Sequence, residues 1–212
     1  MDRSIALPVA TATLAAQLVL GWHPAADRFT WSMENLPVWV GLALLVRFHK
    51  RFPLSNLCLA LLAIHALILA VGGHYTYAKV PLGDWAADIL NLTRNPYDRL
   101  GHFAQGFVPA ILTRELLLRL SPIKKGKLLA FVCLTTCLAF SACYEFIEWG
   151  TALATGEAAE DFLGTQGDTW DTQWDMFMAT IGASVSLLTL SHAHDQSLTS
   201  LLSRTTQTHT VS

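Results

Sequence analysis

Charged residues are scarce in this sequence. Asp, Glu, Lys and Arg make up 14% of its 212 residues, whereas about 25% is usual in a soluble globular domain. Hydrophobic residues make up 52%, and the mean hydropathy is +0.39. This composition disfavours an ordinary soluble domain and favours a protein that is embedded in a membrane.

Several chemical signatures are also missing. The four cysteines, Cys58, Cys133, Cys137 and Cys143, all fall inside apolar segments, so we expect buried small residues rather than a disulfide framework or a thiolate zinc site. The sequence has no GxSxG, HExxH or CxxC motif and no phosphate-binding glycine loop. It also lacks a basic patch interleaved with aromatic residues, and we therefore expect no nucleic-acid partner.

Long runs without charge are what the sequence has instead. A helix needs about 20 apolar residues to cross a bilayer. Four stretches contain no Asp, Glu, Lys or Arg: Ser4–Ala26, Leu54–Ala78, Leu128–Tyr144 and Met176–Ala193. Leu36–Val46 is short, and Leu100–Thr113 is followed at once by Arg114 and Glu115. We predict an all-α, polytopic transmembrane bundle of about six helices, or five if Leu36–Val46 only dips into the bilayer.

The domain organisation is simple. Residues 1–194 are predicted to form a single transmembrane domain, whose first helix is an uncleaved span rather than a signal peptide. Residues 195–212 are rich in Ser and Thr, and we expect a poorly ordered tail. His192, His194 and Asp195 have a spacing typical of metal ligands, but our interpretation is chance spacing on a solvated tail.

Basic residues predict the orientation, because Lys and Arg in short loops stay on the cytoplasmic side. They cluster after the second and fourth predicted spans, at Arg47, Lys50, Arg51, Arg119, Lys124, Lys125 and Lys127. With six spans these clusters and both termini share the cytoplasmic side. Most of the acidic residues then face outward, toward the periplasm or the cell exterior.

Polar side chains repeat at helical spacing on three of the predicted helices. Asp98, His102 and Gln105 would share one face of a helix that starts near Pro96, because they lie four and three residues apart. Two acids, Glu145 and Glu148, end the fifth apolar stretch, and further acids precede the last one. We expect one outward-facing polar seam, formed by Asp98, His102, Glu145, Glu148, Asp171 and Asp175, with Arg99, Gln105, Gln166, Asp168 and Gln173 nearby.

The seam needs positive charge or protons, because crowded buried carboxylates raise one another's pKa. One hypothesis is a divalent metal, Mg or Mn for a carboxylate-rich set or Zn because of the histidine, held by Glu145, Asp168, Asp171 and Asp175. In the same hypothesis His102 acts as general acid or base, Asp98 orients it, and Glu148 completes the catalytic set. The alternatives are acid–base chemistry without a metal and a purely structural polar network that includes Arg99.

Three motifs of the sequence carry a family resemblance. They are Tyr97-Asp98-Arg99-Leu100-Gly101-His102-Phe103, Glu145-Phe146-Ile147-Glu148-Trp149 and the stretch 164–176, which begins Gly-Thr-Gln-Gly-Asp. These motifs resemble those of the DUF2238, or YjdF-like, family of bacterial inner-membrane proteins. The resemblance covers about residues 30–190 and implies an inner-membrane protein, but it assigns no biochemical function.

A more distant resemblance is to VanZ-like proteins, which are linked to teicoplanin resistance. The residues that match the three VanZ-like motifs are Asp98, Arg99 and His102, then Glu145, then Asp175 and Gly182. Glu148 and Ala179 stand where the VanZ-like pattern usually has Gln and Asn.

We therefore expect the seam to carry out chemistry on, or recognition of, a cell-envelope lipid or lipid-linked molecule, with membrane lipids as partners. A rival hypothesis is a proton- or cation-coupled transporter, in which the same acids bind the coupling ion. A further alternative is a non-catalytic envelope factor whose seam is structural.

Overall fold

The computed structural model describes residues 5–155 and 165–209 of the chain, and within these it contains helices and no strand. The elements, in order, are α1 (Ala6–Trp22), α2 (Arg28–Phe48), α3 (Asn56–Tyr75), the 3-10 turn η1 (Tyr77–Lys79), α4 (Pro81–Leu90), α5 (Tyr97–Leu120), α6 (Lys127–Thr155) and α8 (Asp171–His209). The predicted all-α fold is confirmed.

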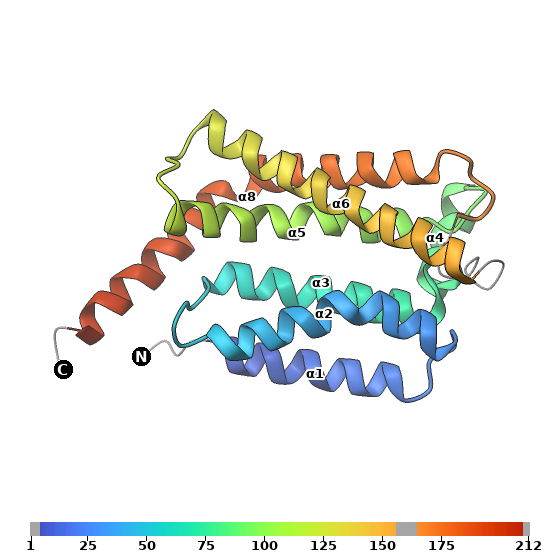
Figure 1. The fold of residues 1–212 in the computed structure, drawn as a ribbon, viewed down its shortest axis with the longest axis horizontal. Helices are drawn as coiled ribbons and strands as arrows, with labels where there is room; N and C mark the ends of the chain where they lie inside the picture. Colours follow the sequence, from blue (N-terminus) through green and yellow to red (C-terminus); the bar gives the residue numbers. More distant parts are fainter. Residues whose placement is uncertain (1–4, 156–164, 210–212) are drawn as a thin grey trace.

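The long helices run back and forth along one axis in two layers (Figure 1). Helices α1, α2 and α3 form one layer, and α5, α6 and α8 form the other. The layers meet chiefly where α3 packs on α5, and the closest helix pair is α5 with α8. Both termini lie at one end of the bundle, which we call the termini end, and α4 lies at the opposite α4 end.

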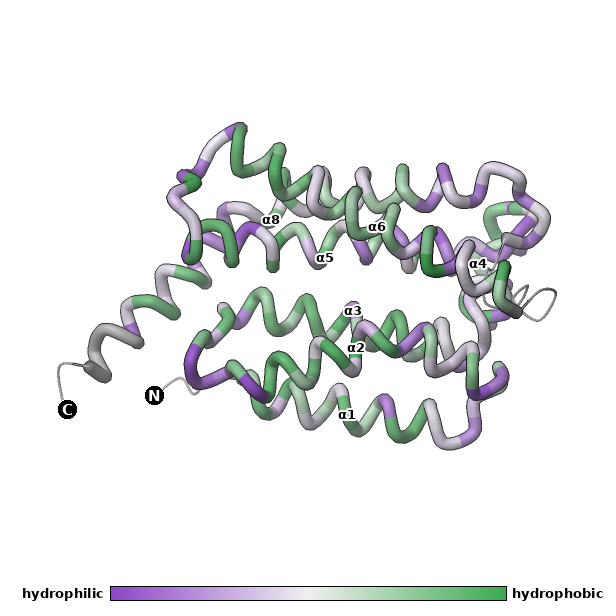
Figure 2. The backbone as a smooth tube through the Cα atoms, in the orientation of Figure 1, coloured by the Kyte–Doolittle hydropathy of each residue, from purple (hydrophilic) through white to green (hydrophobic). Residues whose placement is uncertain are grey.

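The helices have the length and composition of a membrane protein. By these criteria α2, α3, α6 and α8 are each long and apolar enough to span a bilayer, and α1 is a shorter apolar helix of 17 residues. Hydrophobic residues extend along the helices, and hydrophilic ones gather mainly toward the two ends (Figure 2). Large apolar side chains such as Val19, Phe131 and Leu188 face outward, as expected where lipid is the solvent. The chain is a polytopic helical membrane protein.

Helix α2 is longer than the sequence suggested. It begins at Arg28 and continues through Pro37 for 21 residues, which is about 31 Å of helix. Asp27 starts it, because its carboxylate accepts the N–H groups of Phe29 and Thr30 at 2.7 and 3.0 Å and the Thr30 hydroxyl at 2.6 Å. Glu34, which precedes the predicted run Leu36–Val46, lies within this helix and is buried. A helix of this length is long enough to cross the bilayer, so α2 is a candidate span and not a segment that only dips into the bilayer.

Helix α8 also departs from the prediction. It continues to His209, where a poorly ordered tail had been expected from residue 195 onward. His194 is fully buried rather than solvated: its Nδ1 lies 2.6 Å from Arg114 Nη1 and its Nε2 lies 3.1 Å from Glu115 Oε2. Asp195 pairs with Arg114 and Lys125, each at 2.8 Å. Interpreting His194 as part of a solvated tail was wrong, because α5 supplies its partners.

These contacts belong to what we call the termini-end network, formed by Ser55, Arg114, Glu115, Arg119, His194 and Asp195. Glu115 is its centre and is fully buried. Its Oε1 accepts the Ser55 main-chain N–H at 2.9 Å and the Arg119 guanidinium at 3.0 Å, and its Oε2 faces His194. The network fastens the start of α3 to α5 and α8.

Glycines let α5 and α8 touch backbone to backbone. A Cβ built on Gly106 would lie 1.8 Å from the Ala179 carbonyl oxygen, and one on Gly182 would lie 2.0 Å from that of Phe103. No side chain larger than hydrogen fits at either position without moving the helices apart. This contact holds α5 and α8 in register and thereby sets His102 opposite Asp175.

Candidate functional site

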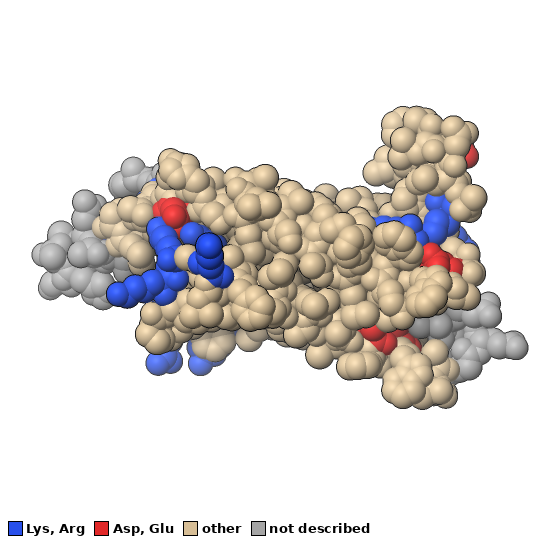
Figure 3. Space-filling model, turned by 90° about the horizontal axis from the view of Figure 1, so that it is seen from above, with Lys and Arg blue, Asp and Glu red and all other residues tan. Residues whose placement is uncertain are grey.

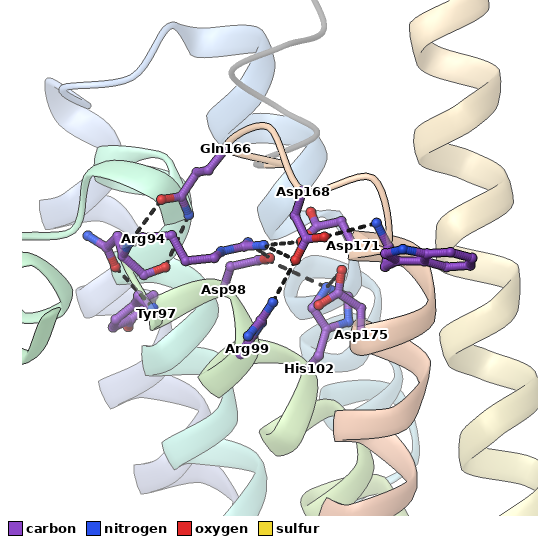
Figure 4. A network of polar contacts seen from close by, with 11 residues as sticks. Arg94, Tyr97, Asp98, Arg99, His102, Gln166, Asp168, Asp171 and Asp175 are labelled. Atoms are coloured by element: carbon purple, nitrogen blue, oxygen red, sulfur yellow. Dashed lines mark hydrogen bonds and ion pairs between the residues drawn. The ribbon is translucent and has the colours of Figure 1, made fainter. Parts of the chain in front are cut away.

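The polar residues predicted on α5 and α8 come together with the loop before α8 (Figure 4), and Glu148 of α6 lines a cavity with Asp98 and His102. Each has at most 9% of its surface exposed: Asp98 and His102 on α5, Glu145 and Glu148 on α6, and Asp171 and Asp175 on α8. Asp168 and Gln166 lie in the loop that precedes α8. Gln173, which had been placed near the seam, is exposed.

The start of α5 is fixed by Asn95, which presents Asp98 and His102 to the site. The Asn95 side chain donates to the Val80 carbonyl at 2.9 Å and to Asp84 at 2.8 Å, and it accepts the Tyr97 N–H at 3.0 Å. The Gln166 amide binds the main chain of Asn95 on both sides, at 2.9 and 3.0 Å. Gln166 therefore ties the loop before α8 to the start of α5.

His102 is held in one orientation. Its Nδ1 lies 2.9 Å from Gln105 Oε1, and because an amide oxygen only accepts, we assign the ring proton to Nδ1. The Nε2 lone pair then points between two carboxylates, 3.6 Å from Asp98 Oδ1 and 3.8 Å from Asp175 Oδ2. These distances are too long for good hydrogen bonds, but they suit ligands that surround an ion.

Asp98, His102 and Asp175 form a group that fits a metal ion. One ligand atom from each lies within 4.8 Å of the others, and all three residues are buried. Among the described residues, Asp175 Oδ1 and Glu145 Oε1 are buried without a hydrogen-bond partner. Buried carboxylate oxygens without partners are costly, and a bound cation would satisfy them.

Two arginines neutralise Asp171 and Asp168, and one of them also pairs with Asp98. Arg94 pairs with Asp171, with Asp98 at 3.3 Å and with Asp168 at 3.4 Å. Burial is the largest single influence and lowers the pKa of the Arg94 guanidinium, but the hydrogen bond and charge of Asp171, together with the charges of Asp98 and Asp175, outweigh it and the pKa is raised, so Arg94 stays charged. Arg99 binds Asp168 at 2.8 Å and lies 5.0 Å from the centre of the Trp174 ring.

The ion pairs separate two kinds of acid. Asp168 and Asp171, both predicted as metal ligands, have guanidinium partners, and Asp168 also accepts the Trp170 N–H at 2.9 Å. Asp175 and Glu145 keep an oxygen without a partner among the described residues. Asp98 pairs with Arg94 through Oδ2 but turns Oδ1 toward His102, so the Asp98–His102–Asp175 group is the better metal site, with Glu145 beside it.

A small cavity of about 70 Å³ opens beside this group. Its walls come from both layers and include Glu34, His65, Tyr77, Asp98, His102, Tyr144 and Glu148. Glu34 accepts a hydrogen bond from the Tyr144 hydroxyl at 3.0 Å, and the Tyr77 side chain also hydrogen-bonds to it.

Sequence reasoning missed four contributors to the site. An acid inside the apolar run of α2 was a signal for Glu34, because buried ionisable residues in membrane helices are costly. Arg94 stands four residues before Asp98, a spacing that favours an ion pair on one helix face. Tyr77 and Tyr144 gave no signal, because tyrosines are common at membrane interfaces whatever they contact.

Residues 5–196 match the family described as "Predicted membrane protein (DUF2238)". The chain belongs to the DUF2238 family. It is also 47% identical over 196 residues to "Inner membrane protein YjdF" from Escherichia coli (strain K12), an alignment that covers 92% of this chain and 94% of that protein. No solved structure matches the chain.

All residues of the site lie within the stretch that matches DUF2238. The family description and the name of the relative place these proteins in membranes, and the relative in the inner membrane. The comparisons do not show the more distant likeness to VanZ-like proteins. The DUF2238 membership thus agrees with the membrane fold. Because the family description names no chemistry, the chemistry of the site is inferred from its geometry.

Proposed function

We propose that this DUF2238 protein binds a divalent cation, Mg²⁺, Mn²⁺ or Zn²⁺, through Asp98, His102 and Asp175, and that the site acts on or recognises a cell-envelope lipid or lipid-linked molecule. One observation carries the proposal. The three residues present ligand atoms within 4.8 Å of one another, and Asp175 Oδ1 has no partner among the residues described.

The surroundings of His102 support this assignment. Metal-binding histidines usually donate their other ring N–H to an oxygen, which fixes the ring and raises its basicity. Gln105 takes that role here at 2.9 Å. Three protein ligands leave a coordination position for water or substrate, which is the arrangement of catalytic metal sites.

Proton transfer would then fall to a glutamate. A metal-bound His102 cannot also be the general base, whereas Glu145 has an oxygen without a partner in the described part of the chain. Glu148 lies one turn farther along the same helix and is also buried. Without a metal, His102 takes the acid–base role and Asp98 orients it.

The proposed orientation places the site on the periplasmic side. The two basic clusters follow α2 and α5, and both of these turns lie at the termini end, opposite the site. Figure 3 shows Lys and Arg side chains gathered at that end, an uncharged middle, and mixed charges at the α4 end. By the positive-inside rule both termini are cytoplasmic.

Tryptophans support a position at the depth of the lipid headgroups. Four tryptophans are each more than 60% exposed: Trp22 ends α1, Trp85 lies on α4, Trp149 lies in the last two turns of α6, and Trp170 directly precedes α8. Indole rings prefer the membrane–water interface. A lipid headgroup would therefore lie at the level of the site.

Metal analysis of the purified protein tests the proposal. We expect about one equivalent of a divalent metal per chain, as three convergent ligands imply, after dialysis against a mixture of Mg²⁺, Mn²⁺ and Zn²⁺. Asp175→Asn and His102→Ala should lose it. Asp168→Asn is the discriminating variant. It should retain the metal, because the Asp168 carboxylate pairs with Arg94 and Arg99 and is not a ligand.

Metal loss in Asp168→Asn, with retention in Asp175→Asn, would overturn the ligand set. Wild-type protein that retains no metal would overturn the function itself. In that case a structural polar network becomes the better account.

A cation-coupled transporter is the second candidate, favoured by one observation. Buried titratable groups occupy both ends of the α5–α8 pair, His102 with Asp175 at one end and His194 with Glu115 at the other. Between them the backbones touch at Gly106 and Gly182, so a permeation path would need these helices to separate. To test this function, proton flux is measured into vesicles that contain the wild type and into vesicles that contain His194→Ala. A transporter should give a flux that the variant loses.

A further inference from the structure

The cavity beside the metal group is lined by hydrogen-bond acceptors from both layers of the bundle. Carboxyl groups come from α2, α5 and α6 as Glu34, Asp98 and Glu148. Two tyrosines, Tyr77 and Tyr144, direct their hydroxyl groups to Glu34. We call this space the acceptor chamber.

The charge of the chamber is unbalanced. Among the residues that the structure describes, its lining includes three carboxyl groups and two imidazoles, His65 and His102, but no Lys or Arg. Asp98 pairs with Arg94, whereas the other ion pairs of Arg94 and Arg99 are with Asp168 and Asp171, so Glu34 and Glu148 have no guanidinium partner in the described part of the chain. A cation in the chamber would balance the carboxylates, and an anion would be repelled.

An independent observation also indicates a missing ligand. His65 lines the chamber. Its Nε2 atom is buried and has no hydrogen-bond partner among the described residues. His65 lies on α3. Since nearly all buried polar atoms are hydrogen-bonded, a ligand in the chamber would supply the partner that this atom lacks.

Size and hydrogen bonding select the kind of cation. A volume of about 70 Å³ is roughly that of two water molecules, so the occupant is small. A primary ammonium has three N–H donors, which Glu34, Glu148 and Asp98 can accept. A quaternary ammonium has no donor, and its methyl groups would leave the acceptors unsatisfied.

We propose that the acceptor chamber binds the primary ammonium of an aminoalkyl phosphate headgroup. This inference rests on the proposed function, because Asp98 and His102 belong to both the chamber and the metal group. An ammonium in the chamber sets the adjoining phosphate toward the metal, with Arg94 close by. The substrate class is then a zwitterionic phosphate that carries a primary amine, such as a phosphatidylethanolamine headgroup.

The test measures which lipid the full-length protein retains. The protein is reconstituted in nanodiscs of dioleoylphosphatidylglycerol mixed equally with dioleoylphosphatidylethanolamine or with dioleoylphosphatidylcholine, and bound lipid is counted by native mass spectrometry. Losing a charge-assisted hydrogen bond costs about tenfold in binding. We expect the wild type to prefer the ethanolamine lipid by at least that factor.

Two variants locate the preference. Glu34→Gln should bring retention of the ethanolamine lipid down to that of the choline lipid while leaving the metal content unchanged, because Glu34 lies outside the metal group. Tyr144→Phe, which removes only the hydroxyl that holds Glu34, should weaken the preference less. Asp88→Asn, an exposed acid on α4, is the control and should match the wild type.

The outcomes separate the two proposals. Equal retention of both lipids by the wild type, or an undiminished preference in a folded Glu34→Gln protein, overturns the chamber assignment even if metal is bound. A metal-free wild type that still prefers the ethanolamine lipid overturns the metal function and keeps the chamber. Competition with free phosphoethanolamine distinguishes a diffusible headgroup, which displaces the lipid, from a ligand that must be membrane-anchored.

Discussion

Two buried polar clusters lie on the same helices, α5 and α8, at opposite ends of the bundle, and they differ in how completely they are satisfied. In the termini-end network, both oxygens of Glu115 and both ring nitrogens of His194 have partners. At the α4 end, oxygens of Asp175 and Glu145 have none among the described residues.

The difference teaches how to recognise a functional site in a membrane bundle. Burial and ionisable side chains alone do not distinguish the clusters, since both have them. Completed pairs pin helices together, whereas an excess of acid over base with oxygens left without partners indicates that something outside the chain completes the site. The comparison therefore predicts opposite responses to mutation.

The largest effect is expected at the satisfied end. Glu115→Ala leaves the Ser55 N–H and the buried His194 without their carboxylate partner and takes from Arg119 one of its two acceptors, and we expect a loss of about 3–5 kcal/mol in the free energy of unfolding. Denaturation of the purified protein in mixed micelles, followed by helical circular dichroism, measures it. Asp88→Ala serves as control. A loss no larger than that of the control would show that the termini-end network is not structural.

A smaller loss is expected at the contact that joins the two ends. Gly182→Ala would force α5 and α8 apart, because its Cβ would lie 2.0 Å from the Phe103 carbonyl oxygen, at a cost of about 1–3 kcal/mol. Gly41→Ala on α2 is the matched control, since nothing lies within 4 Å of its Cβ. That control should be neutral or slightly stabilising. Equal unfolding curves for the two variants would contradict the close contact.

At the α4 end, we do not expect the mutation of an acid to lower the free energy of unfolding. In metal-free protein, Asp175→Asn removes one of several neighbouring negative charges, and we expect the free energy of unfolding to stay level or rise by about 1 kcal/mol. The same denaturation assay is run with a chelator present. A loss comparable to that of Glu115→Ala would mean that Asp175 is an ordinary structural acid and would erase the difference between the clusters.

The remaining effect concerns an acid outside both clusters. This acid is Asp27, which caps the start of α2. The hydrogen bond that the Thr30 hydroxyl donates to its carboxyl group is the main cause that lowers the pKa of Asp27. A lowered pKa in the folded state means that the stabilisation is complete above the ordinary carboxyl pKa of about 3.8 and is lost as the pH falls through the folded value.

Asp27→Ala should therefore cost about 1 kcal/mol at neutral pH, and the difference from wild type should shrink below pH 4 or so. Denaturation curves over a pH series measure it, with Thr30→Val as the control that removes the hydroxyl alone. A difference that grows in acid would contradict the capping role.

Spacing within one helix predicted much of the fold and of the candidate site. The intervals that join Asp98, His102 and Gln105 placed them on one face, and in the structure His102 and Gln105 share a hydrogen bond. Charge-free runs likewise predicted α3, α6 and α8, three of the four helices in the described part of the chain that are long and apolar enough to span a bilayer. Such patterns are visible because the partners lie within a few residues of each other.

The rest depends on contacts between distant residues. His194 finds Arg114 and Glu115 across 80 and 79 positions of the chain, and Tyr144 finds Glu34 across 110. No periodicity within a single helix encodes these pairs. For that reason the tail was judged solvated and the acceptor chamber went unnoticed.

The order of the helices has a consequence for biosynthesis. Chain elongation delivers Asp98 and His102 first and Glu145 next, while Asp175 follows only on the final helix. Until that helix enters the bilayer, Gly106 of α5 has no helix packed against it, and His102 and Glu115 lack Asp175 and His194. A nascent chain that ends before residue 165 would thus expose an incomplete site to the lipid. Insertion of the last helix is therefore the step that completes the site.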